Sequence, residues 1–313
     1  MPGTTPMPPP AKAPTPPPVE DPPPKAPLPP ARPARALLRR TALALPATAV
    51  VLLLLLAAAA PLVAPYDPAA GHLQDRLLDP GAPGHPLGTD GQGRDMLSRL
   101  VWGTRTSLTA GLLPVAVAGA AGTLLGIAAG LGGRVLEQAL LRTLDVLYAF
   151  PGVLLAIAVA TLLRPGLGAT VLALSVVLTP AVARVAFTEV RRIRTAEYLE
   201  AARVSGAGLP SLVLRQVLPV VAPVVLVYCS SLVGLAVVYA AGLSFLGLGV
   251  APPTAEWGAM IDELRPSLLT HPWVAVLPAL TVLLVSVVFN TLGDTLRRRV
   301  GDTGWSALPE TVR

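Results

Sequence analysis

The sequence predicts an all-α membrane protein that crosses the bilayer several times. Of its 313 residues, 53% are hydrophobic and only 13% are charged, and the mean hydropathy is +0.64. A soluble domain carries about a quarter charged residues. The apolar residues gather in runs of about 20, the length that a helix needs to cross a bilayer. These observations exclude a large soluble core and predict a polytopic protein with six transmembrane helices.

The N-terminal residues 1–38 form a proline-rich segment. Sixteen of the 36 prolines lie between Pro2 and Pro33. Proline fixes φ and removes a hydrogen-bond donor, so this segment cannot pack as a helix or a sheet. We therefore predict a disordered cytoplasmic tail, with a ligand for a proline-recognising domain as the alternative interpretation.

Six apolar runs follow the tail, and each has the length of a membrane span. Residues 39–65 contain the first run, directly after Arg39 and Arg40. Residues 66–107 are expected to form an external loop, and residues 108–300 a core with the other five spans. The predicted spans are Ala42–Val63, Leu108–Leu131, Leu141–Leu163, Ala169–Phe187, Val217–Leu243 and Val274–Leu292.

The distribution of basic residues gives the orientation in the membrane. With both termini in the cytoplasm, 17 of the 24 Lys and Arg residues fall in cytoplasmic regions and six in external regions, while Arg184 lies within a span. Cytoplasmic segments of membrane proteins carry such an excess. We therefore place the tail 1–38, the loop 191–219 and the tail 301–313 in the cytoplasm.

The first apolar run also resembles an export signal, because Arg39 and Arg40 precede it and small residues lie near its end. The run is long enough to cross a bilayer, however, and five more runs follow it. A retained membrane helix is therefore the favoured interpretation.

Several chemistries are excluded by what the sequence lacks. Cys229 is the single cysteine, so no disulfide can form within the chain, and the three histidines lack the spacing of a metal site. A Walker A phosphate loop requires a lysine, and the only lysines are Lys12 and Lys25 in the tail. The net charge of +6 gathers beside the apolar runs, which indicates membrane orientation. We therefore expect this chain to bind no cofactor, no metal and no nucleic acid.

The loop 191–219 is polar and helix-prone although it lies between long apolar runs. Thr195 can cap a helix whose first turn contains Glu197. Gly206 is where a left-handed residue would end that helix. A second short helix would then lead to Pro219, at the join to the fifth span. This pattern predicts a charged helix that is displayed on the aqueous side of the membrane, and an ordinary interfacial helix is the alternative.

This loop resembles the coupling loop of bacterial ABC importer permeases. The resemblance rests on Glu200-Ala201-Ala202, on Gly206, and on Leu218-Pro219, in that order and spacing. It implies that Glu200 offers charge, that the two alanines allow close contact, and that Gly206 makes the turn. The residues that it implies for coupling to a separate ATPase are Glu197, Glu200, Ala201, Ala202, Gly206, Leu218 and Pro219.

Further motifs extend the resemblance to one branch of the family, the C-type subunits of dipeptide, oligopeptide and nickel importers. They are His85–Asp95 with Gly103–Leu108, Leu141–Asp145 with Phe150-Pro151, Leu243–Gly249 with Trp257-Gly258, and Phe289-Asn290 with Leu292–Asp294. The resemblance implies the type I ABC importer permease fold, with six transmembrane helices in this subunit and no ATP site of its own.

The resemblance also implies a function and a set of partners. The chain would be the membrane subunit of an ATP-driven peptide importer in the bacterial inner membrane. Its partners would be a B-type permease, two ABC ATPases that hold ATP and magnesium, an extracytoplasmic substrate-binding protein, and membrane lipid. Nickel or another small solute stays open as the substrate, and an ion-coupled secondary transporter is the alternative from another class.

The first external loop contains a glycine-rich motif with alternating charges. Its glycines permit turns and its charged residues can pair: the motif comprises Gly88, Asp90, Gly91, Gly93, Arg94 and Asp95. We expect Asp90 and Asp95 to form surface ion pairs with Arg94 and Arg99, each worth about 0–1 kcal/mol.

Hydroxyl groups on or just past the fifth span could line a path for a peptide. They belong to Tyr228, Ser231, Tyr239 and Ser244. The alternative is that these residues allow helices to pack closely.

Two ionisable residues, Arg184 and Asp145, lie in or near predicted spans, where such residues usually face an interior or an interface. We expect Asp145 to pair with Arg142 on one helical face, near the cytoplasmic end of its span. A role in transport is the alternative for Arg184 and for Asp145. Asp262 and Glu263, in the last external loop, are expected to be solvated.

Overall fold

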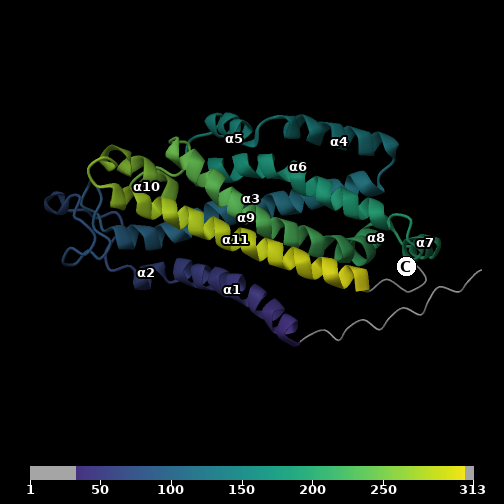
Figure 1. The fold of residues 1–313 in the computed structure, drawn as a ribbon. Coiled ribbons are helices and arrows are strands. Elements are labelled where there is room, and N and C mark those ends of the chain that lie inside the picture. Colours follow the sequence, from purple (N-terminus) through teal and green to yellow (C-terminus); the bar gives the residue numbers. More distant parts are fainter. Residues whose placement is uncertain (1–32, 307–313) are drawn as a thin grey trace, which may run out of the picture.

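Four long helices form the frame of the molecule in this computed structural model, which describes residues 33–306, with side chains described from 43 to 299. They are α3 (Met96–Leu131), α6 (Leu167–Ile193), α9 (Leu218–Phe245) and α11 (Pro272–Ser306). These helices pack side by side along the length of the molecule (Figure 1). Residues 33–306 contain no strand, only isolated bridges in a loop, which confirms the predicted all-α class.

The shorter helices lie around this frame and at its two ends. The first helix, α1 (Pro33–Ala58), is followed by α2 (Ala60–Val63), and the 3-10 turn Leu73–Asp75 lies in the long loop before α3. Because α1 begins at Pro33, residues 33–38 are helical, whereas residues 1–32 of the predicted tail lie outside the described part of the chain. Of the predicted tail 301–313, residues 307–313 also lie outside it.

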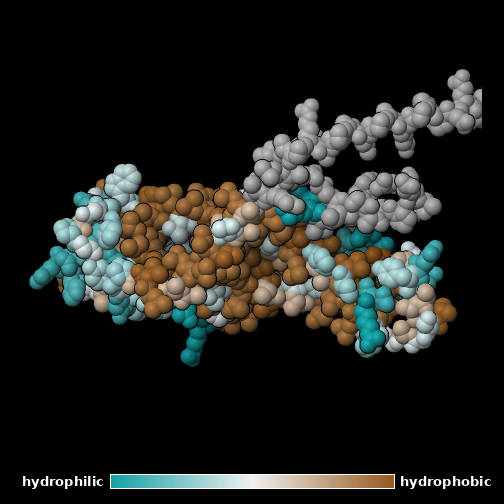
Figure 2. Space-filling model, turned by 90° about the horizontal axis from the view of Figure 1, so that it is seen from below, coloured by the Kyte–Doolittle hydropathy of each residue, from teal (hydrophilic) through white to brown (hydrophobic). Residues whose placement is uncertain are grey.

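In the part of the chain that the structure describes, four continuous helical segments are long and apolar enough to cross a membrane: Met96–Leu131, Leu167–Ile193, Leu209–Phe245 and Pro272–Arg299. Between the two ends, hydrophobic side chains form a broad brown band in Figure 2, as a bilayer requires. The apolar part of α1 that the structure describes, Leu43–Ala58, is shorter. The predicted total of six spans therefore stays a prediction for α1 and for the bent pair described next.

The third predicted span, Leu141–Leu163, is not one straight helix. It is divided between α4 (Arg134–Ala149) and α5 (Gly152–Thr161), which meet at an angle of 93°. Phe150 precedes Pro151 and is extended, because the proline ring disfavours the helical conformation of the residue before it. The motif Phe150-Pro151 therefore marks a bend within the span.

The second span also begins earlier than expected, at Met96 instead of Leu108. Asp95 caps this helix, because its carboxylate accepts hydrogen bonds from the Ser98 backbone N–H and hydroxyl, both at 2.7 Å. Residues 96–107, predicted as part of the external loop, are thus the first turns of α3.

Close packing of α3 on α6 depends on glycines spaced four residues apart. At Gly122, Gly126 and Gly130, an added Cβ atom would come within 2.5–2.9 Å of Val182, Ala183 or Val190 on α6. Such small residues let two membrane helices approach closely. The core continues over α9, α10 (Trp257–Leu264) and α11, and the partly buried Val50 and Leu53 of α1 pack against it.

Candidate functional site

The segment between α6 and α9 lies at one end of the bundle, opposite α10 (Figure 1). It contains α7 (Glu197–Val204) and α8 (Leu209–Leu212). A π-helical turn, Val213–Val217, then continues α8 directly into α9. Pro219 stands at the join to the fifth span as predicted, in the first turn of α9 directly after the π-helical turn, where a missing N–H is tolerated.

Gly206 ends α7 as the sequence predicts. Its φ is +80°, in the left-handed region that favours glycine. The N–H of Ala207 donates to the carbonyl of Ala202 at 3.1 Å, and the N–H of Gly206 donates to the carbonyl of Arg203 at 3.0 Å. These two bonds make the Schellman pattern that satisfies the last carbonyls of a helix.

The start of α7 differs from the prediction, because Thr195 does not cap the helix. Ala196 is the capping residue and has no side-chain bond to offer. The acidic Glu197 and Glu200 lie in the first turn, where negative charge compensates the positive end of the helix dipole. A charge effect thus takes the place of a hydrogen-bonded cap.

One side of α7 packs on the bundle and the rest is exposed. Leu199 has no exposed surface and belongs to the core with Leu212 and Val217. Ala202 is partly buried against the same core, whereas Ala201 is exposed. Of the other residues predicted for coupling, Glu197, Glu200, Gly206 and Pro219 are exposed and Leu218 is partly buried.

Large apolar side chains around α7 and α8 also face outward. Tyr198, Leu209 and Leu214 are exposed, and Val204 is 90% exposed. Beside the exposed carboxylates of α7, these side chains make a mixed polar and apolar surface. Such surfaces indicate a contact with another protein.

The preceding end of α6 is held by α4. The carboxylate of Glu137 accepts a hydrogen bond from Arg191 at 2.7 Å and lies 3.9 Å from Arg194. Arg191 and Arg194 stand only a few residues before α7. The end of α6 that leads into α7 is thus paired with α4.

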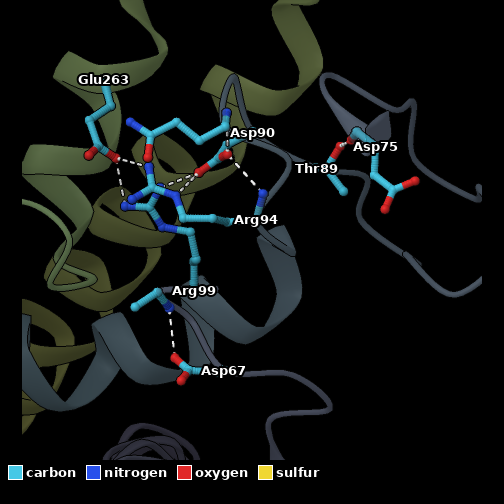
Figure 3. A network of polar contacts seen from close by, with 9 residues as sticks. Asp67, Asp75, Thr89, Asp90, Arg94, Arg99 and Glu263 are labelled. Atoms are coloured by element: carbon cyan, nitrogen blue, oxygen red, sulfur yellow. Dashed lines mark hydrogen bonds and ion pairs between the residues drawn. The ribbon is translucent and has the colours of Figure 1, made fainter. Parts of the chain in front are cut away.

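The second predicted motif, in the loop before α3, forms a buried charge network at the opposite end (Figure 3). The Arg94 side chain donates to Asp90 at 2.6 Å and to Glu263 of α10 at 2.8 Å. Arg99 of α3 donates to the same two carboxylates, at 2.6 Å for Glu263. The four residues therefore connect the loop, α3 and α10.

This network corrects two expectations. Asp90 does pair with Arg94 and Arg99, but the three side chains are almost completely buried and do not form surface bridges. Glu263 is not solvated, because it accepts from both arginines. Asp95 pairs with His85 at 3.0 Å instead of with an arginine, since its other oxygen caps α3.

Hydrogen bonds and charge together set the protonation of Asp90. Burial on its own would raise the pKa of this carboxyl group. The backbone N–H of Arg94 and the positive charges of Arg99 and Arg94 outweigh burial, and the pKa lies below its ordinary value of 3.8. Asp90 is therefore ionised at neutral pH.

Two glycines of the motif are required by the backbone. Gly88 and Gly93 have φ near +75°, and an added Cβ atom at Gly93 would meet the backbone of His72. Gly91 has no positive φ and open space around it. The loop keeps its shape through Gly88, Gly93 and the charge network.

Comparison with known proteins identifies the family. Residues 122–302 match the model of the binding-protein-dependent transport system inner membrane component. The chain belongs to this family of importer permeases. It is 40% identical over 233 residues to the glutathione transport system permease protein GsiD of Pectobacterium atrosepticum, covering 74% of this chain and 77% of that protein. It is 41% identical over 244 residues to the di/tripeptide transport system permease protein DppC of Pseudomonas aeruginosa, covering 76% and 80%.

Solved structures agree on the fold of the permease. A chain of the MetNI methionine ABC transporter in an inward-facing conformation aligns with a TM-score of 0.52 at 18% identity, over 64% of this chain and 97% of that one. An amino acid ABC transporter aligns with a TM-score of 0.50 at 16% identity, over 65% and 94%. The predicted type I importer permease fold is thereby confirmed, as is the predicted resemblance to the family.

The hydroxyl residues predicted for a path do not share one surface of the permease. Ser231 is directed toward Gly293 of α11, whereas Tyr239 adjoins Gly152 of α5. Tyr239 also borders a cavity of about 240 Å³ between α5 and α9, lined mainly by apolar side chains. Ser244 is buried in the turn at the end of α9, and Tyr228 is partly buried. Their role in transport stays a prediction.

The ionisable residues of the spans find a partner that the sequence spacing did not indicate. Asp145 of α4 pairs with Arg184 of α6 at 2.5 Å, instead of with Arg142. The Arg184 guanidinium also lies over the ring of Tyr148, 4.6 Å from its centre. Arg184 and Asp145 thus form one site with Tyr148 between α4 and α6.

Proposed function

We propose that this permease is the C-type membrane subunit of an ATP-driven peptide importer. The observation that carries the proposal is the helix α7, whose polar face and apolar neighbours are exposed in the part of the chain that the structure describes. The names of its relatives, which transport glutathione or di- and tripeptides, support a peptide as the substrate.

The importer would contain a B-type permease, two ABC ATPases and an extracytoplasmic binding protein besides this chain. ATP and magnesium would be held by the ATPases, since the only lysines of this chain, Lys12 and Lys25, stand in its proline-rich tail. The chain would cross the bacterial inner membrane with both termini in the cytoplasm, as its basic residues favour. The end with α7 would then face the ATPases, and the end with α10 the binding protein.

Coupling would proceed through the contacts of α7. When two ATPases close on ATP, the ATPase surface that holds α7 moves. Leu199 would transfer that movement to the core, and Glu137 would transfer it to α4 through Arg191. The spans would thereby change from an inward-facing to an outward-facing arrangement around the path.

The test compares two substitutions of nearly equal shape at Gly206. An added side chain meets nothing within 4 Å there, and both Asn and Asp tolerate a positive φ better than most residues. The permease is co-expressed with its partner permease and ATPases, and dipeptide uptake and ATP hydrolysis are measured. We expect Gly206→Asp to reduce uptake relative to hydrolysis by on the order of tenfold, because a buried unpaired charge at the ATPase contact costs at least about 1–3 kcal/mol.

Gly206→Asn is the control and should keep most of the coupling, since it carries no charge. If Gly206→Asp leaves uptake and hydrolysis unchanged, α7 is not the contact with the ATPase. Uptake that persists in the absence of any ATPase would contradict the importer mechanism as a whole.

A further inference from the structure

The site formed by Arg184, Asp145 and Tyr148 has features that packing alone does not explain. Its two charged side chains are not buried between helices, since 46% of Arg184 and 57% of Asp145 is exposed. Tyr148 is exposed as well. All three residues therefore present their polar groups on an outer face of this subunit.

The site lies inside the predicted spans, toward their cytoplasmic ends. Arg184 stands three residues before the end of its predicted span at Phe187, and Asp145 stands four residues after the start of its predicted span at Leu141. At 1.5 Å per residue, both lie about 5–6 Å inside those spans. A lipid-facing charge at this depth is costly, so such residues face water or another polar surface.

The ion pair leaves most of its hydrogen-bonding capacity unused. Arg184 donates one N–H to Asp145, and among residues 43–299 its guanidinium makes no other hydrogen bond. A guanidinium has five N–H donors, and an ionised carboxylate has two acceptor oxygens. The free edge of Arg184 can thus bind a carboxylate, and the free oxygen of Asp145 can bind an ammonium group.

We propose that this face lines the aqueous path and that the Arg184–Asp145 pair binds the two charged ends of a peptide in transit. Arg184 takes the terminal carboxylate and Asp145 takes the terminal ammonium group, while Tyr148 contacts the peptide between them. The assignment rests on the proposed peptide importer and names the groups that recognise its substrate.

The first test asks whether the face meets water. Cys229, which is buried, is replaced by Ala, and a single reporter cysteine is introduced in the assembled importer in liposomes. Ala149→Cys stands one turn from Asp145 on the same face of α4, and the matched control Ala279→Cys stands on the exposed apolar side of α11. A charged methanethiosulfonate should modify Ala149→Cys at least about tenfold faster, because the reactive thiolate forms in water and not in an apolar layer. Equal rates would mean that lipid or a neighbouring subunit covers the face, and would overturn the proposal.

The second test asks what the pair binds. L-alanyl-L-alanine should protect Ala149→Cys from modification, and its C-terminal amide and its N-acetyl form should each require at least about tenfold higher concentration, since each loses one charge-assisted hydrogen bond. In Arg184→Gln, the free peptide and the amide should protect equally. In Asp145→Asn, the free peptide and the N-acetyl form should protect equally.

Each outcome decides the proposal. Equal protection by all three peptides on the unsubstituted pair overturns it, and this comparison stands even where a variant does not assemble. Unchanged preferences in both variants also overturn it, because another group would then recognise the peptide ends. If the three peptides behave as expected but the importer takes up no peptide, the site stands and the proposed function fails. If uptake proceeds while all three peptides protect equally, the inference fails alone.

Discussion

The two ends of the permease are stabilised in opposite ways. At the end with α10, a buried network of two arginines and two carboxylates ties a long loop to α3 and α10. At the end with α7, Leu199 is the one buried side chain of the helix, and the partly exposed Glu137–Arg191 pair joins only the preceding end of α6 to α4. Most of α7 is exposed.

This difference separates a fixed surface from one that is completed by a partner. Buried ion pairs between separate elements fix how those elements lie relative to one another. A short helix with few buried contacts opens at low free energy and is free to follow whatever binds it. We therefore expect substitutions at the α10 end to unfold the loop, and substitutions at the α7 end to change coupling before they change stability.

The largest effect is expected for Asp90→Ala. The substitution removes the carboxylate that lies between two buried guanidinium groups. Removing one partner of a buried ion pair lowers the free energy of unfolding by about 3–5 kcal/mol. Thermal unfolding of the purified subunit in detergent, with limited proteolysis of the loop, measures the loss. Asp262→Ala is the control, because its ion pair with Arg265 is 3.8 Å long and largely exposed, and should change stability by less than about 0.5 kcal/mol. Equal effects of the two substitutions would show that the network does not hold this end.

A smaller and more local effect is expected for Leu199→Ala. Leu199 is fully buried, and it is the one fully buried residue in α7. Because the rest of α7 contributes little to the core, we expect the truncation to lower the free energy of unfolding by about 2 kcal/mol, at the low end for such substitutions. Hydrogen exchange should increase in α7 while α3 and α6 keep their protection. Tyr198→Ala, on the exposed side, should leave exchange in α7 unchanged. A loss of protection across the whole bundle in Leu199→Ala would contradict the independence of this end.

The contrast also explains which features could be predicted from the sequence. The long helices and the end of α7 at Gly206 depend on local properties, namely the length of an apolar run and the freedom of glycine to take a positive φ. The early start of α3 also has a local signal, because Asp95 is a preferred N-cap residue whose carboxylate accepts from the backbone N–H of Ser98. The bend of the third span was indicated by Phe150-Pro151, since a residue before proline avoids the helical conformation.

The polar partners could not be predicted in the same way. Glu263 meets Arg94 across 169 positions of sequence, and Arg184 meets Asp145 across 39. Helical spacing gave Arg142 as the partner of Asp145, because spacing rules compare residues within one helix only. Which helices lie next to each other is decided by packing, as at the glycines of α3, and charge pairs follow from that packing.

The last prediction uses acid to compare the two ends. The pKa of Asp90 lies below 3.8 in the folded permease, so its contribution to stability is complete above about pH 3.8 and is lost only as the pH falls through the lower folded value. We therefore expect proteolytic protection of the loop 66–95 to stay constant from pH 7 to pH 5 and to fall only below about pH 3.8. Asp90→Asn serves as the control, because it cannot titrate and should lose this acid transition. A loss of protection near pH 5 that is absent in Asp90→Asn would mean that burial raises the pKa of Asp90 by more than the two arginines lower it. The charge network would then not be what stabilises this end of the molecule.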